Sequence, residues 1–471
     1  MADLPRHGRT WILRGVLLAA LFALWIAPVP EGLTPQAWRL FAIFAATIAA
    51  VVLDALPILT ASVLAVSIAV LTGTLPAAKA YSGFANGTIL LIVVAFLVAR
   101  AVIICGLGKR IGYVVVSLFG RSTLGLSYSI FLVDAVIAPA FPSNTARSGV
   151  LYPLAVSLAD AAGSKPGDPS RPRVGAFLMF SGLASLSISS GLWMTAMAAN
   201  PIGAEIAKAS GPTITFGSWI VAACVPSLAA IVLLPLILYK LIGPEVTKTP
   251  EAPAEAKKQL AALGPMSRNE WIVLVTFAGM VLLWGAAGTL GLDSTAIAFL
   301  GLAVLLISGA LSLSDIAKQG DVLVIYLWFA ILFTISSQLD ELGFMAFVGD
   351  KLAGALAGMS GLAAGVLLVV AYVLLHYLFV SQTAHLLALF GVFLDVGVRL
   401  GVPAGPLAFQ LLFATNYFSV ITPQGGSSNL LFAGSGYLTQ GQLYKYGAIV
   451  TGCSMLIYLI LGTPWLMLVA R

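Results

Sequence analysis

The stretch that decides the fold is Ala140-Phe-Pro-Ser-Asn-Thr-Ala-Arg147, a polar break in the middle of a long apolar run. Pro142 ends a helix at this point, because proline lacks an N–H group and clashes with the preceding turn. Ser143, Asn144 and Thr145 are suited to capping the next helix, whose free N–H groups favour an anion. The stretch therefore predicts a helical hairpin with an anion-binding tip.

A second stretch, Val380-Ser-Gln-Thr-Ala-His385, repeats this pattern in the C-terminal half of the chain. A further polar break follows each stretch, at 187–200 in the first half and at 422–429 in the second. Such breaks at membrane depth are tolerated only where protein or water satisfies the backbone. Their freed carbonyl and N–H groups can coordinate a cation or an anion, so we expect the four breaks to meet at one site.

The composition requires lipid as the solvent for much of the surface. Of the 471 residues, 60% are hydrophobic and only 9% are charged, whereas an ordinary soluble domain carries about 25% charged residues. This balance argues against a soluble enzyme and a disordered protein. The net charge of +6 does not indicate nucleic-acid binding, because the basic residues lie in short loops rather than in a stripe. The cysteines have no metal-binding spacing, and we expect no metal and no cofactor.

Apolar runs near the length of about 20 residues that crosses a bilayer recur along the chain. Straight spans are expected at 11–28, 36–56, 57–73, 87–105, 216–242, 271–291, 294–313, 322–339 and 443–469. Four interrupted stretches remain: two re-entrant hairpins at about 125–160 and 361–400, and two broken helices at about 174–208 and 405–438.

The distribution of basic residues sets the expected orientation. With the N-terminus in the cytoplasm, this arrangement places most Lys and Arg residues inside, as the positive-inside rule requires. The expected fold is an all-α polytopic membrane protein with about 11 transmembrane helices plus two re-entrant hairpins. We expect it in the cell inner membrane, with its C-terminus outside.

The two halves of the chain repeat the same order of segments. In 1–242 an apolar span, a Gly-rich amphipathic piece and a hairpin follow one another, and the same order recurs in 271–471. The segment 243–270 is expected to be an exposed cytoplasmic linker. Because an odd number of crossings separates the halves, they run in opposite directions. Inverted repeats with broken helices are typical of secondary transporters, which hold the substrate near the midplane.

With its paired Ser-Asn-Thr and Ser-Gln-Thr segments, each followed by an unwound helix, the chain resembles the divalent anion:sodium symporter (DASS) family over nearly its whole length. The resemblance implies a homodimer, each protomer having a scaffold part and a transport part that moves as an elevator. It implies substrates such as succinate, malate, 2-oxoglutarate and citrate, and in some members sulfate. By position, it implies substrate contacts from Ser143, Asn144, Thr145, Ser381, Gln382 and Thr383, with Thr195, Asn200, Thr422 and Pro423 closing the site.

One residue departs from the family's pattern. The second motif is usually Ser-Asn-Thr, and here Gln382 replaces its Asn. In sodium-coupled members both Asn side chains help to form sodium sites. The longer glutamine therefore disfavours at least the second sodium site.

Two basic residues lie at matching positions behind the tips. Arg147 follows Ser143, and His385 follows Ser381, by one helical turn, so each faces the same side of its helix as the tip serine. We expect them to act as a charge-compensating pair where a coupling cation would otherwise bind. An ion pair of Arg147 with Asp134 and a purely structural histidine remain open alternatives. Because a tethered cation cannot leave, an empty carrier would move uncompensated charge through a low-dielectric barrier.

These features predict a secondary active transporter that exchanges dicarboxylates by an elevator mechanism, independently of sodium. The alternative is a sodium-coupled di- or tricarboxylate symporter of the same fold. A hydrolase using Ser143 or Ser381 with His385 is disfavoured, because no GxSxG elbow and no third partner are evident. A channel is also disfavoured, because hairpins from opposite sides suit alternating access. No enzyme activity is expected, and the expected partners are small dicarboxylate anions, the lipid bilayer and a second copy of the chain.

Overall fold

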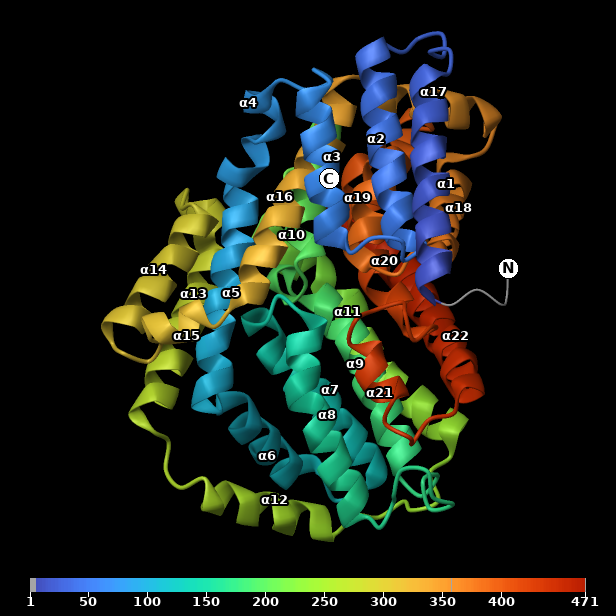
Figure 1. Ribbon diagram of the computed structural model, residues 1–471. Helices are drawn as coiled ribbons and strands as arrows, with labels where there is room; N and C mark the ends of the chain where they lie inside the picture. The colour runs from blue at the N-terminus through green and yellow to red at the C-terminus, as the bar shows by residue number, and fades with distance from the viewer. Residues whose placement is uncertain (1–5, 357, 471) are drawn as a thin grey trace.

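The computed structural model describes residues 6–356 and 358–470, and Figure 1 shows their course. Within these ranges the regular structure is helical, apart from one isolated β-bridge between Ser122 and Lys248. The helices up to the linker are α1 (Arg6–Ile26), α2 (Pro35–Val52), α3 (Ile58–Leu71), α4 (Ala77–Ala80), α5 (Gly87–Cys105), α6 (Leu107–Phe119), α7 (Thr123–Ile137), α8 (Asn144–Ala161), α9 (Gly175–Leu192), α10 (Ala199–Ala207) and α11 (Phe216–Ile242).

The linker holds one helix, and the remainder of the chain is again helical. These helices are α12 (Glu251–Ala262), α13 (Arg268–Leu290), α14 (Ser294–Ile307), α15 (Leu313–Ala317), α16 (Gly320–Glu341), α17 (Phe344–Ala355), α18 (Gly361–Leu375), α19 (Gln382–Arg399), α20 (Ala404–Tyr417), α21 (Asn429–Ala433), α22 (Gln440–Ile457) and α23 (Thr463–Val469). A π-helical turn, Tyr458–Gly462, joins α22 to α23. The all-α fold expected from the sequence is confirmed for the described residues.

Many of these helices are long and apolar enough to cross a bilayer. Among the described residues, nine helical segments meet this condition by length and composition, and three shorter apolar helices accompany them. The nine include the first arm of each hairpin, Thr123–Ala140 and Gly361–Leu378. The chain is therefore a multi-pass membrane protein.

Both hairpins form where the polar stretches predict them. In the first, α7 continues into the short helix η2 (Ala138–Ala140), and the chain reverses at Pro142 before α8 begins. In the second, α18 continues into η5 (His376–Leu378) and the chain reverses before α19. Figure 1 shows α7 and α8 in the lower half of the molecule and α18 and α19 in the upper half, so the two tips point toward the middle from opposite ends.

The two broken helices lie beside the hairpins. The first is α9, the short helix η3 (Met194–Ala196) and α10, and the second is α20, η6 (Phe418–Val420) and α21. Every residue of α9 is buried, and this helix packs against α7, α8, α11 and α20. It is therefore the core against which the first hairpin and the second broken helix are placed.

The segment expected as an exposed linker is partly helical and is docked on the protein. Helix α12 packs along α6 at the lower end of the molecule. The Arg110 guanidinium of α6 donates to Glu270 Oε1 over 2.5 Å and to the carbonyl of Gly264 over 2.9 Å. These bonds tie the end of the linker to the amphipathic helix that leads into the first hairpin.

Candidate functional site

The tips of the two hairpins share one cavity of about 200 Å³. The first tip contributes Pro142, Ser143 and Asn144, and the second contributes the segment 380–383. Two segments far apart in sequence thus provide similar polar groups to one small volume. This is the meeting point that the sequence predicts for the breaks.

Two long helices begin at this cavity. Ser143 and Ser381 both have extended backbones, and their hydroxyl oxygens accept hydrogen bonds from the N–H groups of Ala146 and Ala384, each over 3.3 Å. Helices α8 and α19 therefore direct their N-terminal ends, each carrying about half a positive elementary charge, toward the same space. The lining side chains include no charged group among the described residues. Attraction for an anion thus comes from the main chain.

Most of the expected tip residues line the cavity. They are Ser143, Asn144, Ser381, Gln382 and Thr383. Thr145 is not among the lining residues: it is exposed, and its Oγ1 lies 2.6 Å from Oγ of Ser427. It joins the first tip to the second broken helix beside the cavity.

The residues expected to close the site lie just outside the lining. Thr195, Asn200, Thr422 and Pro423 do not line the cavity, and the residues of the two breaks that do line it are Met197, Ala198, Gly426 and Ser427. Asn200 is fully buried and donates to the carbonyl of Ser190. The Thr422 carbonyl accepts a hydrogen bond from Asn429. In the sequence, the Gly-Gly-Ser run at 425–427 was the signal that could have identified Gly426. The structure shows why its neighbour is also glycine: a Cβ on Gly425 would collide with the carbonyl of Ser419.

Each break is fastened to its own hairpin. In the first half the Trp193 indole donates to the carbonyl of Ala135 over 2.8 Å, and the N–H of Ala198 donates to the carbonyl of Pro142 over 3.0 Å. In the second half Nε2 of His376 lies 3.0 Å from the carbonyl oxygen of Gly425. The hairpin and the break therefore present the lining residues of each half as one unit.

Arg147 lies behind the first tip and is fully buried. Its guanidinium forms an ion pair with Asp134 over 3.0 Å and also donates to Ser189 and Ser190. A further N–H group donates to Asn144 Oδ1 over 2.6 Å. Arg147 therefore reaches the cavity only through Asn144, and its charge is balanced by a buried carboxylate. This is the ion pair that the sequence left open.

Gln382 takes a similar position behind the second tip. Its Nε2 donates to the carbonyl of Thr415 over 2.8 Å and lies 3.4 Å from the carbonyl of Asn416. These carbonyls belong to the end of α20, where the second broken helix begins to unwind. The amide that distinguishes this chain from the usual motif thus occupies backbone oxygens beside the cavity.

His385 lies one turn behind the second tip, among aromatic rings. Its ring centroid is 4.3 Å from that of Tyr372, 5.0 Å from that of Phe379 and 4.9 Å from that of Phe418. Neither ring nitrogen has a hydrogen-bond partner in the part of the chain that the structure describes. Ser381 is therefore not hydrogen-bonded to His385, as an activated nucleophile would be.

The wall opposite the tips is apolar, and no sequence motif marks it. It consists of Phe96 from α5 together with Ile325, Trp328 and Phe329 from α16. These residues belong to ordinary apolar spans, so composition cannot separate them from lipid-facing or core positions. Their role follows only from the packing of α16 against α5.

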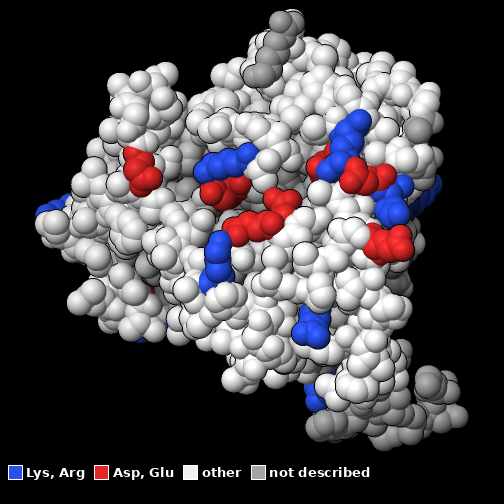
Figure 2. All heavy atoms as spheres, turned by 90° about the horizontal axis from the view of Figure 1, so that it is seen from above, with Lys and Arg blue, Asp and Glu red and all other residues white. Residues whose placement is uncertain are grey.

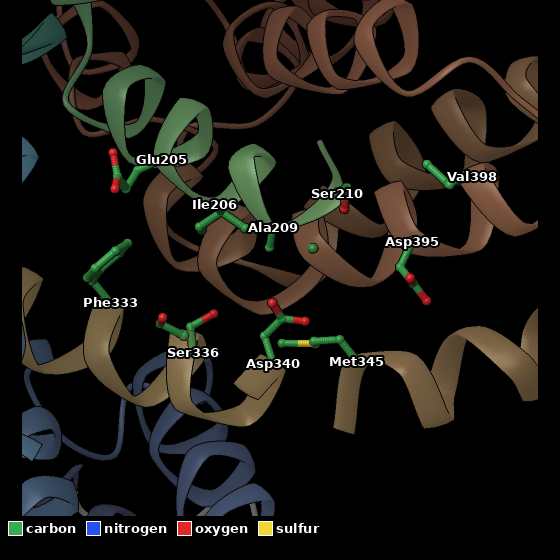
Figure 3. Close-up of a pocket in the computed structure, with 12 residues that line it drawn as sticks. Glu205, Ile206, Ala209, Ser210, Phe333, Ser336, Asp340, Met345, Asp395 and Val398 are labelled. Carbon is green, nitrogen blue, oxygen red and sulfur yellow. The ribbon is translucent and has the colours of Figure 1, made fainter. Parts of the chain in front are cut away.

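A second cavity of about 360 Å³ lies farther along α16, between α10, α17 and α19. Figure 3 shows that Glu205, Asp340 and Asp395 reach toward it from three different helices. Glu205 pairs with Lys208 and Asp395 pairs with Arg399, each over 2.6 Å. Even with two of its three carboxylates paired, this cavity is less favourable for a carboxylate substrate than the uncharged cavity at the tips. Among the described residues, no group of three His, Cys, Asp or Glu is arranged to hold a metal ion.

Comparisons with known proteins cover nearly the whole chain. A family model described as the sodium:sulfate symporter transmembrane region matches residues 9–471. The chain is 39% identical over 452 residues to the putative malate transporter YflS of Bacillus subtilis, covering 96% of this chain and 95% of that protein. It is 39% identical over 443 residues to the chloroplastic dicarboxylate transporter 2 of Spinacia oleracea, covering 93% and 78%.

One solved structure shares the fold. The crystal structure of the YdaH transporter of Alcanivorax borkumensis matches with a TM-score of 0.59, covering 84% of this chain and 89% of that one. The sequence identity is 17%. At this identity the match shows a common fold and no more.

Proposed function

Since this chain belongs to the divalent anion:sodium symporter (DASS) family, we propose that it carries dicarboxylates such as malate, succinate and 2-oxoglutarate across the membrane. In this proposal it works as a sodium-independent exchanger. The names of its relatives, a malate transporter and a dicarboxylate transporter, support this class of substrate. The observation that carries the proposal is that two long helices direct their N-terminal ends into one cavity. Each end suits one carboxylate.

Independence of sodium is supported by the donors that occupy nearby oxygens. A sodium ion needs unprotonated oxygen ligands. Here Asn144 Oδ1 accepts from Arg147, and the carbonyl of Thr415 accepts from Gln382. Tethered N–H groups thus occupy the side-chain oxygen of the first motif's Asn, which by resemblance helps to bind sodium in sodium-coupled members, and one carbonyl beside the second motif.

Exchange, rather than net uptake, follows from the positive potential at an empty site. The N-termini of α8 and α19 together present about one elementary charge to the cavity. A bound dicarboxylate offsets this potential. Without an anion, moving the site through a low-dielectric barrier costs several kcal/mol.

We extend the proposal to the moving parts. The hairpins and broken helices form a transport part, whereas α5 and α16 belong to a scaffold on which it slides as an elevator in a homodimer. The apolar wall from α5 and α16 opposite the polar tips supports this division. The proposed halves are 1–242 and 271–471, joined by the linker 243–270, in an inner membrane with the N-terminus cytoplasmic and the C-terminus outside.

Counterflow in proteoliposomes tests the function. Vesicles containing the purified protein are loaded with malate, succinate, 2-oxoglutarate or citrate, and uptake of labelled malate is followed with and without sodium. We expect uptake only into vesicles loaded with a transported acid, and the same rate in both salts. Liposomes that contain the internal acid but no protein are the control.

Two outcomes contradict the proposal. Strong sodium-driven uptake into vesicles without internal substrate would identify the sodium-coupled symporter instead. Uptake that is insensitive to the internal acid would indicate a channel, because preloaded substrate cannot stimulate flux through an open pore.

A further inference from the structure

Two buried asparagines join the two halves of the site behind the cavity. Asn200 lies in α10 and Asn416 at the end of α20, and both are fully buried. Nδ2 of Asn416 donates to Oδ1 of Asn200 over 2.9 Å. Neither residue lines the cavity. Because this hydrogen bond between two side-chain amides is buried away from water, it holds α10 and α20 in one register.

At each end the bridge continues to a hairpin tip. Nδ2 of Asn200 donates to the Ser190 carbonyl over 2.8 Å, and the Ser190 hydroxyl donates to Asn144 Oδ1 over 2.7 Å. On the other side, the carbonyl oxygen of Asn416 lies 3.4 Å from Nε2 of Gln382. Hydrogen bonds that pass through Ser190 and the two asparagines therefore connect Asn144 of the first tip with Gln382 of the second.

We propose that the Asn200–Asn416 bridge sets the spacing between the two tips and thereby the chain length of the acid that the site accepts. This inference rests on the proposed function, in which each tip holds one carboxylate of the same molecule. A dicarboxylate must meet both tips at once, so its fit depends on their separation. The other polar contact across the site, Thr145 with Ser427, is exposed and in competition with water. Asn200 and Asn416 are thus positioning residues, acting through Asn144 and Gln382.

The test compares two acids that differ by one methylene group. Exchange is measured in proteoliposomes for succinate and glutarate with wild type, Asn200→Ala, Asn416→Ala and the double variant. Loss of one buried hydrogen bond is expected to bring the ratio of the two KM values closer to unity by about fivefold. The double variant is expected to show the same ratio as each single variant, because one bridge is lost in all three.

Gln410→Ala is the matched control. Gln410 is also buried in α20, and its amide donates to the carbonyl of Tyr458 over 2.7 Å, outside the cavity lining. This variant removes a buried amide from the same helix without touching the bridge. We expect it to leave the ratio of the KM values unchanged even if the amount of folded protein falls.

Other outcomes separate the inference from the proposed function. An unchanged ratio in both single variants, or additive changes in the double variant, would overturn the bridge. Wild-type protein that exchanges neither acid would overturn the proposed function. Should Asn416→Ala not fold, Asn416→Leu keeps the number and branching of the side-chain heavy atoms without the donor and is subject to the same criterion.

Discussion

At the scale of single residues, Arg147 is a charged residue that contacts a lining residue of the cavity without lining the cavity itself. Its guanidinium connects Asp134, in the first arm of the hairpin, to Asn144 at the tip. Both charged groups are fully buried. Removing one partner of such a pair leaves the other charge in a low-dielectric interior, which costs far more than the pair itself contributes.

Arg147→Ala is therefore expected to lower the stability of the protein by about 3–5 kcal/mol and to reduce exchange. The thermal unfolding of the purified protein in detergent measures the first effect, and counterflow measures the second. The double variant Asp134→Leu with Arg147→Met replaces both charges by apolar side chains of similar size and should recover most of the stability.

The same double variant separates stability from transport. Exchange should stay low in it, because Asn144 Oδ1 has lost the charged one of its two tethered donors and keeps only the Ser190 hydroxyl. Full recovery of exchange would mean that Arg147 has no role beyond the fold. An Arg147→Ala protein as stable as wild type would contradict the buried ion pair.

The residues at the tips could be predicted because their information is local. Ser143 follows the helix-ending Pro142, and Ser143 and Ser381 are both of the residue type preferred at a helix N-cap, so the first cap in particular can be predicted from a few neighbouring residues. Met197, Ala198 and the wall residue Phe96 could not be found in this way, because each lies in an ordinary apolar context. The partner of Arg147 was left as an alternative, since sequence distance alone does not fix which way a buried guanidinium points.

At the scale of elements, the close approach of η1 (Ser82–Ala85) to α16 holds the start of α5 in place. The N–H of Gly83 donates to Thr334 Oγ1 over 2.9 Å. A Cβ at Gly83 would collide with the carbonyl oxygen of Ala330 and with the Thr334 hydroxyl. Only glycine lets the two backbones approach this closely.

Gly83→Ala is accordingly expected to destabilise the protein by about 1–3 kcal/mol, as overpacking does when backbone atoms must move. The shift is read from thermal unfolding in detergent. Gly279→Ala in α13 is the control, because no atom lies within 4 Å of its added Cβ, and it should be neutral or slightly stabilising. Equal stability of the two variants would mean that η1 can move away from α16 without cost.

The order of elements was largely predictable, because polar breaks in apolar runs mark where helices stop. Both hairpins and both broken helices appear where those breaks fall. The docking of α12 on α6 was not predictable, because its contacts join residues more than a hundred positions apart. The bond from Arg110 of α6 to Glu270 at the start of α13 spans a similar separation. A segment rich in proline and lysine looks like a free linker until such a partner is seen.

At the scale of the whole molecule, charged groups are few. Figure 2 shows a few basic and acidic groups on an otherwise uncharged upper face, several of them in adjacent pairs of opposite charge. Among the described residues, Lys79 pairs with Glu341 over 2.7 Å and Lys208 with Glu205 over 2.6 Å. The lower end of the molecule (Figure 1) carries the linker helix α12, in which Glu251 and Glu255 are followed by Lys257 and Lys258.

This arrangement yields a test of the proposed orientation. Lys257 of α12 and Lys351 of α17 are exposed. Figure 1 shows these two helices at opposite ends of the molecule. In a protein whose three cysteines are replaced, Lys351→Cys in right-side-out vesicles should react with a membrane-impermeant maleimide. Lys257→Cys should react only after permeabilisation. The reverse pattern would invert the orientation, and reaction of both from one side would contradict the membrane crossing between them.

The convergence of two helix beginnings on a neutral pocket has a consequence for how such carriers diversify. In the proposed mechanism the anion is held by main-chain N–H groups, which among single substitutions only one to proline removes. In the same proposal the choice of co-transported ion depends instead on a few replaceable side chains, such as Gln382 and Arg147. A lineage can therefore change its energy source while still recognising the same acids.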